Sequence, residues 1–151
     1  MKKGLFPGSF DPFTKGHEAI VLKAINLFDE IIIGIGINSN KKYLFDTEKR
    51  IIHIKELFKN YPTVKVGTYQ KLTVDYCKEI GANNIIRGLR NSTDFEYEKS
   101  IAHINTAISG LETVFFLTDE KYSSLNSSII RDLYLNKVDV SPFVTSPELL
   151  V

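Results

Sequence analysis

The sequence predicts an α/β protein built on a Rossmann-like, open, parallel five-stranded sheet with helices on both faces. Short apolar segments alternate regularly with amphipathic ones along the 151 residues, as strands alternate with helices in parallel sheets. The segment Glu30–Ile37 reads EIIIGIGI, an almost continuously apolar run typical of a parallel strand that is covered on both faces. Because ligands of such sheets gather at the carboxyl ends of the strands, we expect the functional residues in the loops that follow them.

The first strand and helix are predicted from a change of periodicity. Lys2–Phe6 is a short apolar strand, and the Pro7-Gly8 pair after it is a turn signal. From His17 onward apolar residues recur every three or four positions, which indicates a helix with one buried face. The residues of this face are Ile20, Val21, Ala24, Ile25 and Phe28.

The second strand, Glu30–Ile37, leads through the polar loop 38–45 into another helix. Asp46 is expected to cap this helix, and Pro62 follows its end. Its buried stripe is predicted to contain Ile51, Ile54, Leu57 and Phe58.

The second half of the chain continues the alternation. Val64–Thr68, Asn84–Ile86 and Glu112–Leu117 are predicted strands. The helices between them are expected at Thr73–Ile80, closed by a left-handed Gly81, and at about Thr93–Ile108, stopped by Gly110. A last helix, capped by Asn126 or a neighbouring serine, runs to about Leu135. No linker or repeat interrupts residues 1–151, so we expect a single domain.

Composition excludes several classes of protein. A hydrophobic share of 43% and a charged share of 25% are ordinary for a globular domain, and the formal charge of +1 gives no reason to expect nucleic-acid or membrane binding. No apolar run approaches the roughly 18 to 20 residues of a membrane span. The chain has one cysteine, Cys77, and no apolar leader region before its first strand. We therefore expect a cytoplasmic protein.

The segment Phe6–His17, FPGSFDPFTKGH, is the most informative part of the chain. It places two hydroxyls and a histidine between a strand and a helix start, where unpaired N–H groups and the helix dipole favour an anion. Thr14, Gly16 and His17 form a T-x-G-H pattern, in which the glycine allows close approach of a ligand. Taken alone, His17 would be better interpreted as a partly buried histidine at a helix start, and it is the neighbouring residues of the motif that favour the phosphate site.

Polar residues follow four of the predicted strands, the first one included. Any single one could be a solvated surface residue, but their recurrence at the strand ends favours a phosphate site. They are Ser9, Lys41, Arg87, Arg90 and the cluster Ser123, Ser124, Ser127 and Ser128.

These motifs resemble the nucleotidyltransferase superfamily, whose signature is an (H/T)-x-G-H turn, and within it the family of bacterial phosphopantetheine adenylyltransferases. FPGSFDPFTKGH is similar to that family's amino-terminal motif, and Ile86–Glu98, IRGLRNSTDFEYE, to its second motif. Leu125–Ser128 is similar to its I-S-S-S helix start. The resemblance implies transfer of the adenylyl group of ATP to 4′-phosphopantetheine with Mg²⁺, giving dephospho-coenzyme A and pyrophosphate in the penultimate step of coenzyme A biosynthesis. It also implies a homohexamer inhibited by coenzyme A.

The same resemblance implies roles for individual residues. The catalytic residues would be His17, Lys41 and Arg87, with His17 stabilising the transition state at the ATP α-phosphate. The residues implied to bind ATP are Ser9, Phe10, Gly16, His17, Gly88, Arg90, Glu98, Tyr122, Ser123, Ser127 and Ser128. Those implied to bind the acceptor are Ser9, Lys41, Leu72, Thr73, Arg87 and Asn105.

Some residues depart from the family pattern or invite other readings. Asn126 replaces a serine but is an equally good helix cap, while Asp132 stands where glutamate is frequent. Cys77 on an apolar helix is expected to be a buried structural thiol. His53 and His103 lack metal-ligand spacing, so no protein-bound metal is predicted.

Two alternatives to this function stay open. A related nucleotidyltransferase could act on nicotinamide mononucleotide or a small alcohol phosphate, although the second motif argues against it. The second alternative is a catalytically silent module that binds a nucleotide or coenzyme A. The presence of His17, Lys41 and Arg87 argues against it.

Overall fold

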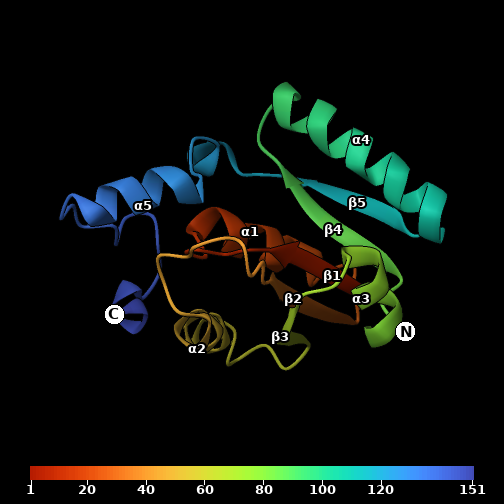
Figure 1. Cartoon of the computed structure of the whole chain (residues 1–151), viewed down its shortest axis with the longest axis horizontal. Helices are drawn as coiled ribbons and strands as arrows, with labels where there is room; N and C mark the ends of the chain where they lie inside the picture. The colour runs from red at the N-terminus through yellow and green to blue at the C-terminus, as the bar shows by residue number, and fades with distance from the viewer.

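The computed structural model describes residues 1–151 and contains one sheet of five parallel strands. The strands are β1 (Lys3–Gly8), β2 (Glu30–Gly36), β3 (Val64–Tyr69), β4 (Asn84–Leu89) and β5 (Glu112–Leu117). Their order across the sheet is β3-β2-β1-β4-β5 (Figure 1). The chain therefore reverses its winding direction between β1 and β4, which is where open sheets of this kind bind ligands.

The strands at this switch point separate toward their carboxyl ends. β1 pairs with β2 along its whole length, from Lys3 to Gly8. With β4 it pairs only through Gly4↔Asn84 and Leu5↔Ile85. The backbone beyond Leu5 thus faces a gap on its β4 side, and this gap leads into the candidate site described below.

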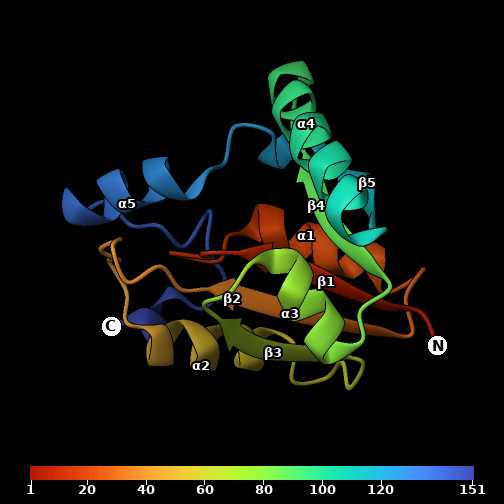
Figure 2. The same ribbon diagram turned by 45° about the vertical axis from the view of Figure 1, so that its right-hand side comes forward.

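The helices cover both faces of the sheet, as expected. They are α1 (Lys15–Ala24), α2 (Thr47–Leu57), α3 (Thr73–Ile80), α4 (Ser92–Ser109) and α5 (Ser127–Leu135), with short 3₁₀-helices η1 (Glu120–Tyr122) and η2 (Pro147–Leu150). Helices α1 and α2 pack on one face, and α3 and α4 on the other. Figure 2 shows α5 outside these layers, on the side toward which the strands point.

Two apolar clusters hold the helices to the sheet. On one face the predicted α1 stripe packs against Ile31, Ile33 and Ile35 of β2. On the other face Val74 and Cys77 of α3 pack against Leu5 and Ile85. Cys77 is fully buried, and burial raises the pKa of its thiol to about 11, so it remains a protonated core residue at neutral pH.

Pro7 and Gly8 do not form the predicted turn, because both belong to β1. The N–H and C=O of one strand residue point to the same side, and the carbonyl of Pro7 points toward β4, where it accepts a hydrogen bond from Arg87. The N–H that proline lacks would therefore face the gap beside β1, where no ladder partner is lost. The Arg87–Leu89 segment, predicted to follow β4, is likewise its last part.

Asp46 occupies the expected cap position of α2, but its side chain makes no capping hydrogen bond. The buried Arg50 organises this helix start instead. Its guanidinium donates to the carbonyl of Phe45 at 3.0 Å and to the hydroxyl of Thr47 at 3.1 Å. The other predicted caps agree with the structure: Gly81 and Gly110 are left-handed, and the Asn126 side chain accepts from the amide of Ile129.

None of the helices is both long and apolar enough to cross a lipid bilayer.

We predict that Gly34→Ala destabilises the protein by about 1–3 kcal/mol. A Cβ at Gly34 would lie 2.7 Å from Leu5 Cδ1 and within 3.2 and 3.3 Å of the Tyr69 and Tyr76 rings. Urea unfolding measures the change. Gly36→Ala is the matched control, because its Cβ would approach no atom closer than 3.4 Å. Equal free energies of unfolding for the two variants would contradict the prediction.

Candidate active site

A cavity of about 370 Å³ lies at the carboxyl edge of the sheet, where β1 and β4 have separated. The first turns of α1 and α5 both contribute to its wall. At α1 the amide of Gly16 makes no protein hydrogen bond, and at α5 the same is true of Ser127 and Ser128. Two helix starts with free N–H groups therefore face one cavity, an arrangement that favours a ligand with several negative charges.

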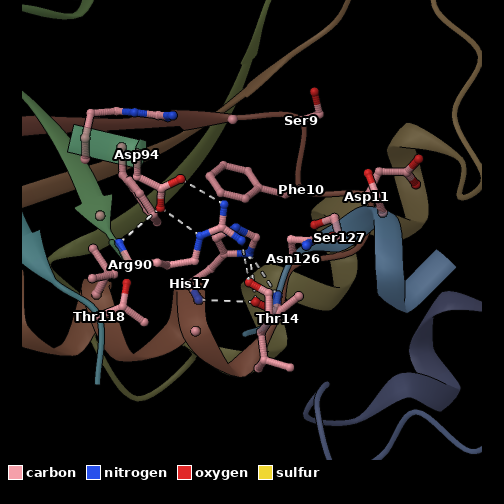
Figure 3. A pocket seen from close by; sticks show the side chains of 18 of the residues that line it. Ser9, Phe10, Asp11, Thr14, His17, Arg90, Asp94, Thr118, Asn126 and Ser127 are labelled. Carbon is pink, nitrogen blue, oxygen red and sulfur yellow. Dashed lines mark hydrogen bonds and ion pairs between the residues drawn. The ribbon is translucent and has the colours of Figure 1, made fainter. Parts of the chain in front are cut away.

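His17 is the third residue of α1 and closes a reciprocal cap with Thr14, the N-cap residue. The Thr14 amide donates to His17 Nδ1 at 3.0 Å, and the Thr14 hydroxyl accepts from the His17 amide at 3.4 Å (Figure 3). An amide can only donate, so Nδ1 must carry a lone pair. In the neutral ring the proton is therefore on Nε2, which is available as a donor.

Aromatic rings fix the orientation of the His17 imidazole. The ring centroids of Phe10 and Phe13 lie 5.1 and 5.2 Å from its own. Phe10 reaches this position with a left-handed backbone, φ 49°, which is uncommon for a bulky residue. A Cβ on Gly8 would lie 2.8 Å from the Phe10 ring, so glycine is required beside it.

The His17 ring is neutral at physiological pH in the ligand-free protein. Burial lowers its pKa to about 3, with smaller contributions from the charges of Arg87 and Arg90. A neutral Nε2–H donor beside these guanidinium groups can bind a phosphate oxygen without first taking up a proton.

Arg87 spans the gap between the two central strands. From β4, its Nη1 donates to the carbonyl of Pro7 on β1 at 2.7 Å. Its Nε and Nη2 donate to the two carboxylate oxygens of Glu98 on α4, at 2.9 and 2.6 Å. This bidentate pair fixes the plane of the guanidinium and leaves further N–H groups for a ligand.

Arg90 is held in a similar way at the start of α4. Its Nε and Nη2 donate to the carboxylate of Asp94 at 2.9 and 3.1 Å, and its Nη1 to the carbonyl of Leu125 at 3.0 Å. Hydrogen bonds from Arg90 hold the pKa of Asp94 below its usual value. The contact with Leu125 also ties α4 to the segment that enters α5.

Asp11 anchors the loop after β1 to the loop after β2. Its carboxylate accepts from the amides of Leu44 and Phe45 at 2.8 and 2.9 Å. The buried Arg50 of α2 also donates to the carbonyl of Ser9, at 2.6 Å. These contacts bring Lys41 Nζ to 3.4 Å from the hydroxyl of Ser9.

Arg131 is a cavity residue that the sequence interpretation did not name. It lies one helical turn after Ser127 and donates to the carbonyl of Asp11 at 2.9 Å and to the hydroxyl of Ser128 at 3.0 Å. Ser127 in turn donates to the carbonyl of Pro12 at 2.9 Å. The spacing was the available signal, because a residue three or four positions after Ser127 and Ser128 shares their helix face.

The structure brings most of the expected site residues together. The main cavity is lined by Ser9, Phe10, Gly16, His17, Lys41, Arg87, Gly88, Arg90, Glu98, Tyr122, Ser127 and Ser128. A second cavity of about 280 Å³ adjoins it and is lined by Thr73 and Asn105, among others. Ser9, Arg87 and Glu98 line both. Leu72 and Ser123 line neither cavity, and Leu72 is 65% exposed at the start of α3.

We predict that His17 of the ligand-free protein stays neutral, as the Nε2–H tautomer, from pH 8 down to pH 5. Its pKa is about 3, whereas the imidazole of the unfolded chain takes up a proton near pH 6.5. Acidification from pH 6.5 toward 3 therefore lowers the contribution of this group to the free energy of unfolding. A ¹⁵N NMR titration of the ring checks the prediction, with free histidine as reference. A midpoint near 6.5 would contradict it.

Comparisons with known proteins agree with this geometry. A family model described as cytidylyltransferase-like matches residues 5–133. A phosphopantetheine adenylyltransferase of Flavobacterium psychrophilum is 54% identical over 144 residues, which cover 95% of both chains. A phosphopantetheine adenylyltransferase of Phocaeicola vulgatus is 46% identical, again over 95% of both chains.

A solved structure shares the fold at low identity. The chain superposes with a TM-score of 0.72 and 18% identity on a bifunctional NMN adenylyltransferase/ADP ribose pyrophosphatase of Francisella tularensis, complexed with AMP and a manganese ion. The match covers 97% of this chain and 46% of that one, so the chain spans about half the length of the bifunctional enzyme. From the family model and the extent of identity, the chain belongs to the cytidylyltransferase-like family and, within it, to the phosphopantetheine adenylyltransferases.

Proposed function

We propose that the protein transfers the adenylyl group of ATP to 4′-phosphopantetheine, forming dephospho-coenzyme A and pyrophosphate. The observation that carries this proposal is the meeting of two cavities at Arg87. The larger one has two helix starts and His17 for a nucleotide triphosphate. The smaller one extends over the α3 and α4 side of the sheet and would take the arm of an acceptor whose phosphate lies at the junction.

The reaction requires positioning and charge stabilisation rather than a general base. The acceptor phosphate is already ionised near neutral pH, so one of its oxygens can attack the ATP α-phosphorus directly. The new P–O bond forms as the bond from the α-phosphorus to the α–β bridging oxygen breaks, and pyrophosphate leaves with that electron pair. Holding two anions in line is then the main task of the protein.

Lys41, Arg87 and the Ser9 hydroxyl would hold the acceptor phosphate. Arg87 suits this task because Glu98 fixes its guanidinium while leaving N–H groups toward the cavity. Lys41 would act from the loop after β2, where its Nζ lies 3.4 Å from the Ser9 hydroxyl.

His17 would donate its Nε2–H to an oxygen of the ATP α-phosphate. In the transition state five oxygens surround the α-phosphorus, and the negative charge on this oxygen increases. The hydrogen bond from His17 is therefore stronger there than in the bound substrate. Arg90, Arg131 and the free amides of Ser127 and Ser128 would receive the β- and γ-phosphates at the start of α5.

We also propose Mg²⁺, brought in as part of the nucleotide substrate. The cavity is nearly balanced in charge, with Lys41, Arg87, Arg90 and Arg131 against Asp11, Asp94 and Glu98, a net charge of +1. The triphosphate of ATP and the phosphate of the acceptor together bring more negative charge than the net charge of +1 can offset. No group of three His, Cys, Asp or Glu side chains is suitably placed to hold a metal ion, so the triphosphate oxygens themselves would bind it.

The assembly, regulation and location that the family resemblance implies are part of this proposal. The homohexamer rests on the family resemblance, and helix α4 offers an apolar surface for subunit contacts, because it buries only Glu98 and leaves Ile104 62% and Ile108 57% exposed. Sedimentation of the purified protein tests this assembly. We further propose inhibition by coenzyme A, which contains the product's pantetheine arm, and a cytoplasmic location.

We predict that the purified protein releases pyrophosphate from MgATP only when 4′-phosphopantetheine is added. Nicotinamide mononucleotide and glycerol 3-phosphate, offered separately, are the control acceptors. Pyrophosphate release with one of the control acceptors, and not with 4′-phosphopantetheine, would agree with adenylyl transfer but would assign a different acceptor. No release with any acceptor would favour a silent binding module.

We predict that His17→Ala lowers kcat about a thousandfold while ATP binding changes less than about tenfold, because the lost hydrogen bond acts mainly in the transition state. Steady-state kinetics and ATP titration measure the two effects. His103→Ala, on the exposed side of α4, is the matched control. Losses of equal size in binding and turnover would refute this role.

We predict that Lys41→Ala and Arg87→Ala raise KM for 4′-phosphopantetheine at least about tenfold, as expected for loss of a charged contact to phosphate. Lys42→Ala is the control, because this exposed neighbour lines neither cavity. An unchanged KM for the acceptor in both variants would count against the proposed phosphate subsite.

A further inference from the structure

The segment Val140–Leu150, here called the C-terminal strap, connects α5 with the side of α2 and passes the start of α1 (Figure 1). The carbonyl of Phe143 accepts from the amide of Lys15 at 2.8 Å. The hydroxyl of Thr145 donates to the Glu18 carboxylate at 2.8 Å. Lys15 and Glu18 flank Gly16 and His17 in the sequence and lie one turn apart on one face of α1, so the strap contacts the helical turn that carries the imidazole at two points.

Thr145 is itself held by α2. His53 Nε2 lies 2.7 Å from the Thr145 carbonyl, and a carbonyl only accepts, so Nε2 carries the proton. The His53 side chain is fully buried, and its Nδ1 has no hydrogen-bond partner. The only polar contact of this buried ring is therefore the one that fixes Thr145.

An apolar cluster connects the strap to the other side of the cavity. Val140, Val144 and Leu150 pack with Phe45, from the loop before α2, and with Ile130 of α5. The strap thus contacts the elements that carry both helix starts of the main cavity. At its turn into η2, Ser146 has a left-handed backbone, φ 52°, a conformation that persists in a non-glycine residue only where the surroundings enforce it.

We infer that Thr145, fixed by His53, is a positioning residue that holds the first turn of α1 so that His17 Nε2 points at the reacting phosphate. The inference rests on the proposed adenylyl transfer for its effect on rate. Its structural basis is independent of the substrate, because the contacts from Thr145 and Phe143 to α1 exist in the free protein. Without them, this turn would be held by the Thr14 cap and by the packing of the His17 ring against Phe10 and Phe13, and helix ends fray.

Kinetics of Thr145 variants test the inference. Thr145→Val removes the donor to Glu18 and is expected to lower kcat about tenfold, with KM for ATP within about twofold, because small misplacements of a catalytic group are costly. Thr145→Ser keeps the hydroxyl and is expected to restore wild-type kcat. Ser141→Ala is the matched control, because this strap residue bonds only to Asp139. A kcat of Thr145→Val within about twofold of wild type would overturn the inference.

The His53 contact gives a second pair of variants. His53→Gln can still donate to the Thr145 carbonyl and is expected to keep kcat, whereas His53→Leu is expected to behave like Thr145→Val. Equal kcat in the two variants would contradict the role of His53, and thermal unfolding identifies variants that fail to fold.

The ¹⁵N spectrum of the His17 ring separates this inference from the proposed function. In the wild type we expect one protonated and one unprotonated ring nitrogen. In Thr145→Val the two resonances should move toward each other as the ring samples both tautomers, and in Ser141→Ala they should not. Absence of pyrophosphate release by the wild type would refute the proposed function alone. An unchanged His17 spectrum in Thr145→Val would overturn the inferred role of Thr145 and leave the proposed function unaffected.

Discussion

The separation of β1 from β4 is the constraint on which the rest of the site depends. Where two parallel strands part, their backbone polar groups lose partners, and each buried one would be costly. Here a side chain replaces the missing backbone partner, since Arg87 of β4 donates a hydrogen bond to the Pro7 carbonyl of β1. The same guanidinium is oriented by Glu98, which also draws α4 to the edge of the gap. One interaction thus keeps the cavity open and places a cation within it.

Neutrality of His17 follows from local packing rather than from a dedicated charge partner. The Nδ1 atom accepts the hydrogen bond of the Thr14 cap, and the rings of Phe10 and Phe13 pack against the imidazole. Both effects arise from a segment of a few residues whose backbone is fixed by Asp11 and Arg50. The donor that faces the cavity is therefore prepared before any ligand binds, which reduces the reorganisation that the reaction requires.

The fold class could be predicted from the sequence because periodicity is a local property. The run Glu30–Ile37 and the apolar stripe of α1 can be recognised without knowing which elements they pack against. It misplaced Pro7 and Gly8 because a proline is tolerated there only through the gap beside β1, a tertiary feature. The bidentate partners of Arg87 and Arg90 were not predicted, since their geometry depends on how α4 meets β4. The strap contacts of Thr145 were equally inaccessible, because they join residues 127 positions apart.

The carboxylates that hold Arg87 and Arg90 also shape the long-range field of the protein. A cavity lined with unpaired guanidinium groups would attract polyanions in general, nucleic acids included. The rate of such association would fall steeply with ionic strength. Here each of these arginines is matched by a neighbouring acid, so little potential extends into solvent and recognition is confined to hydrogen-bonding distance. Ligand capture should therefore depend only weakly on salt, and a spent polyphosphate can diffuse away without crossing a strong electrostatic well.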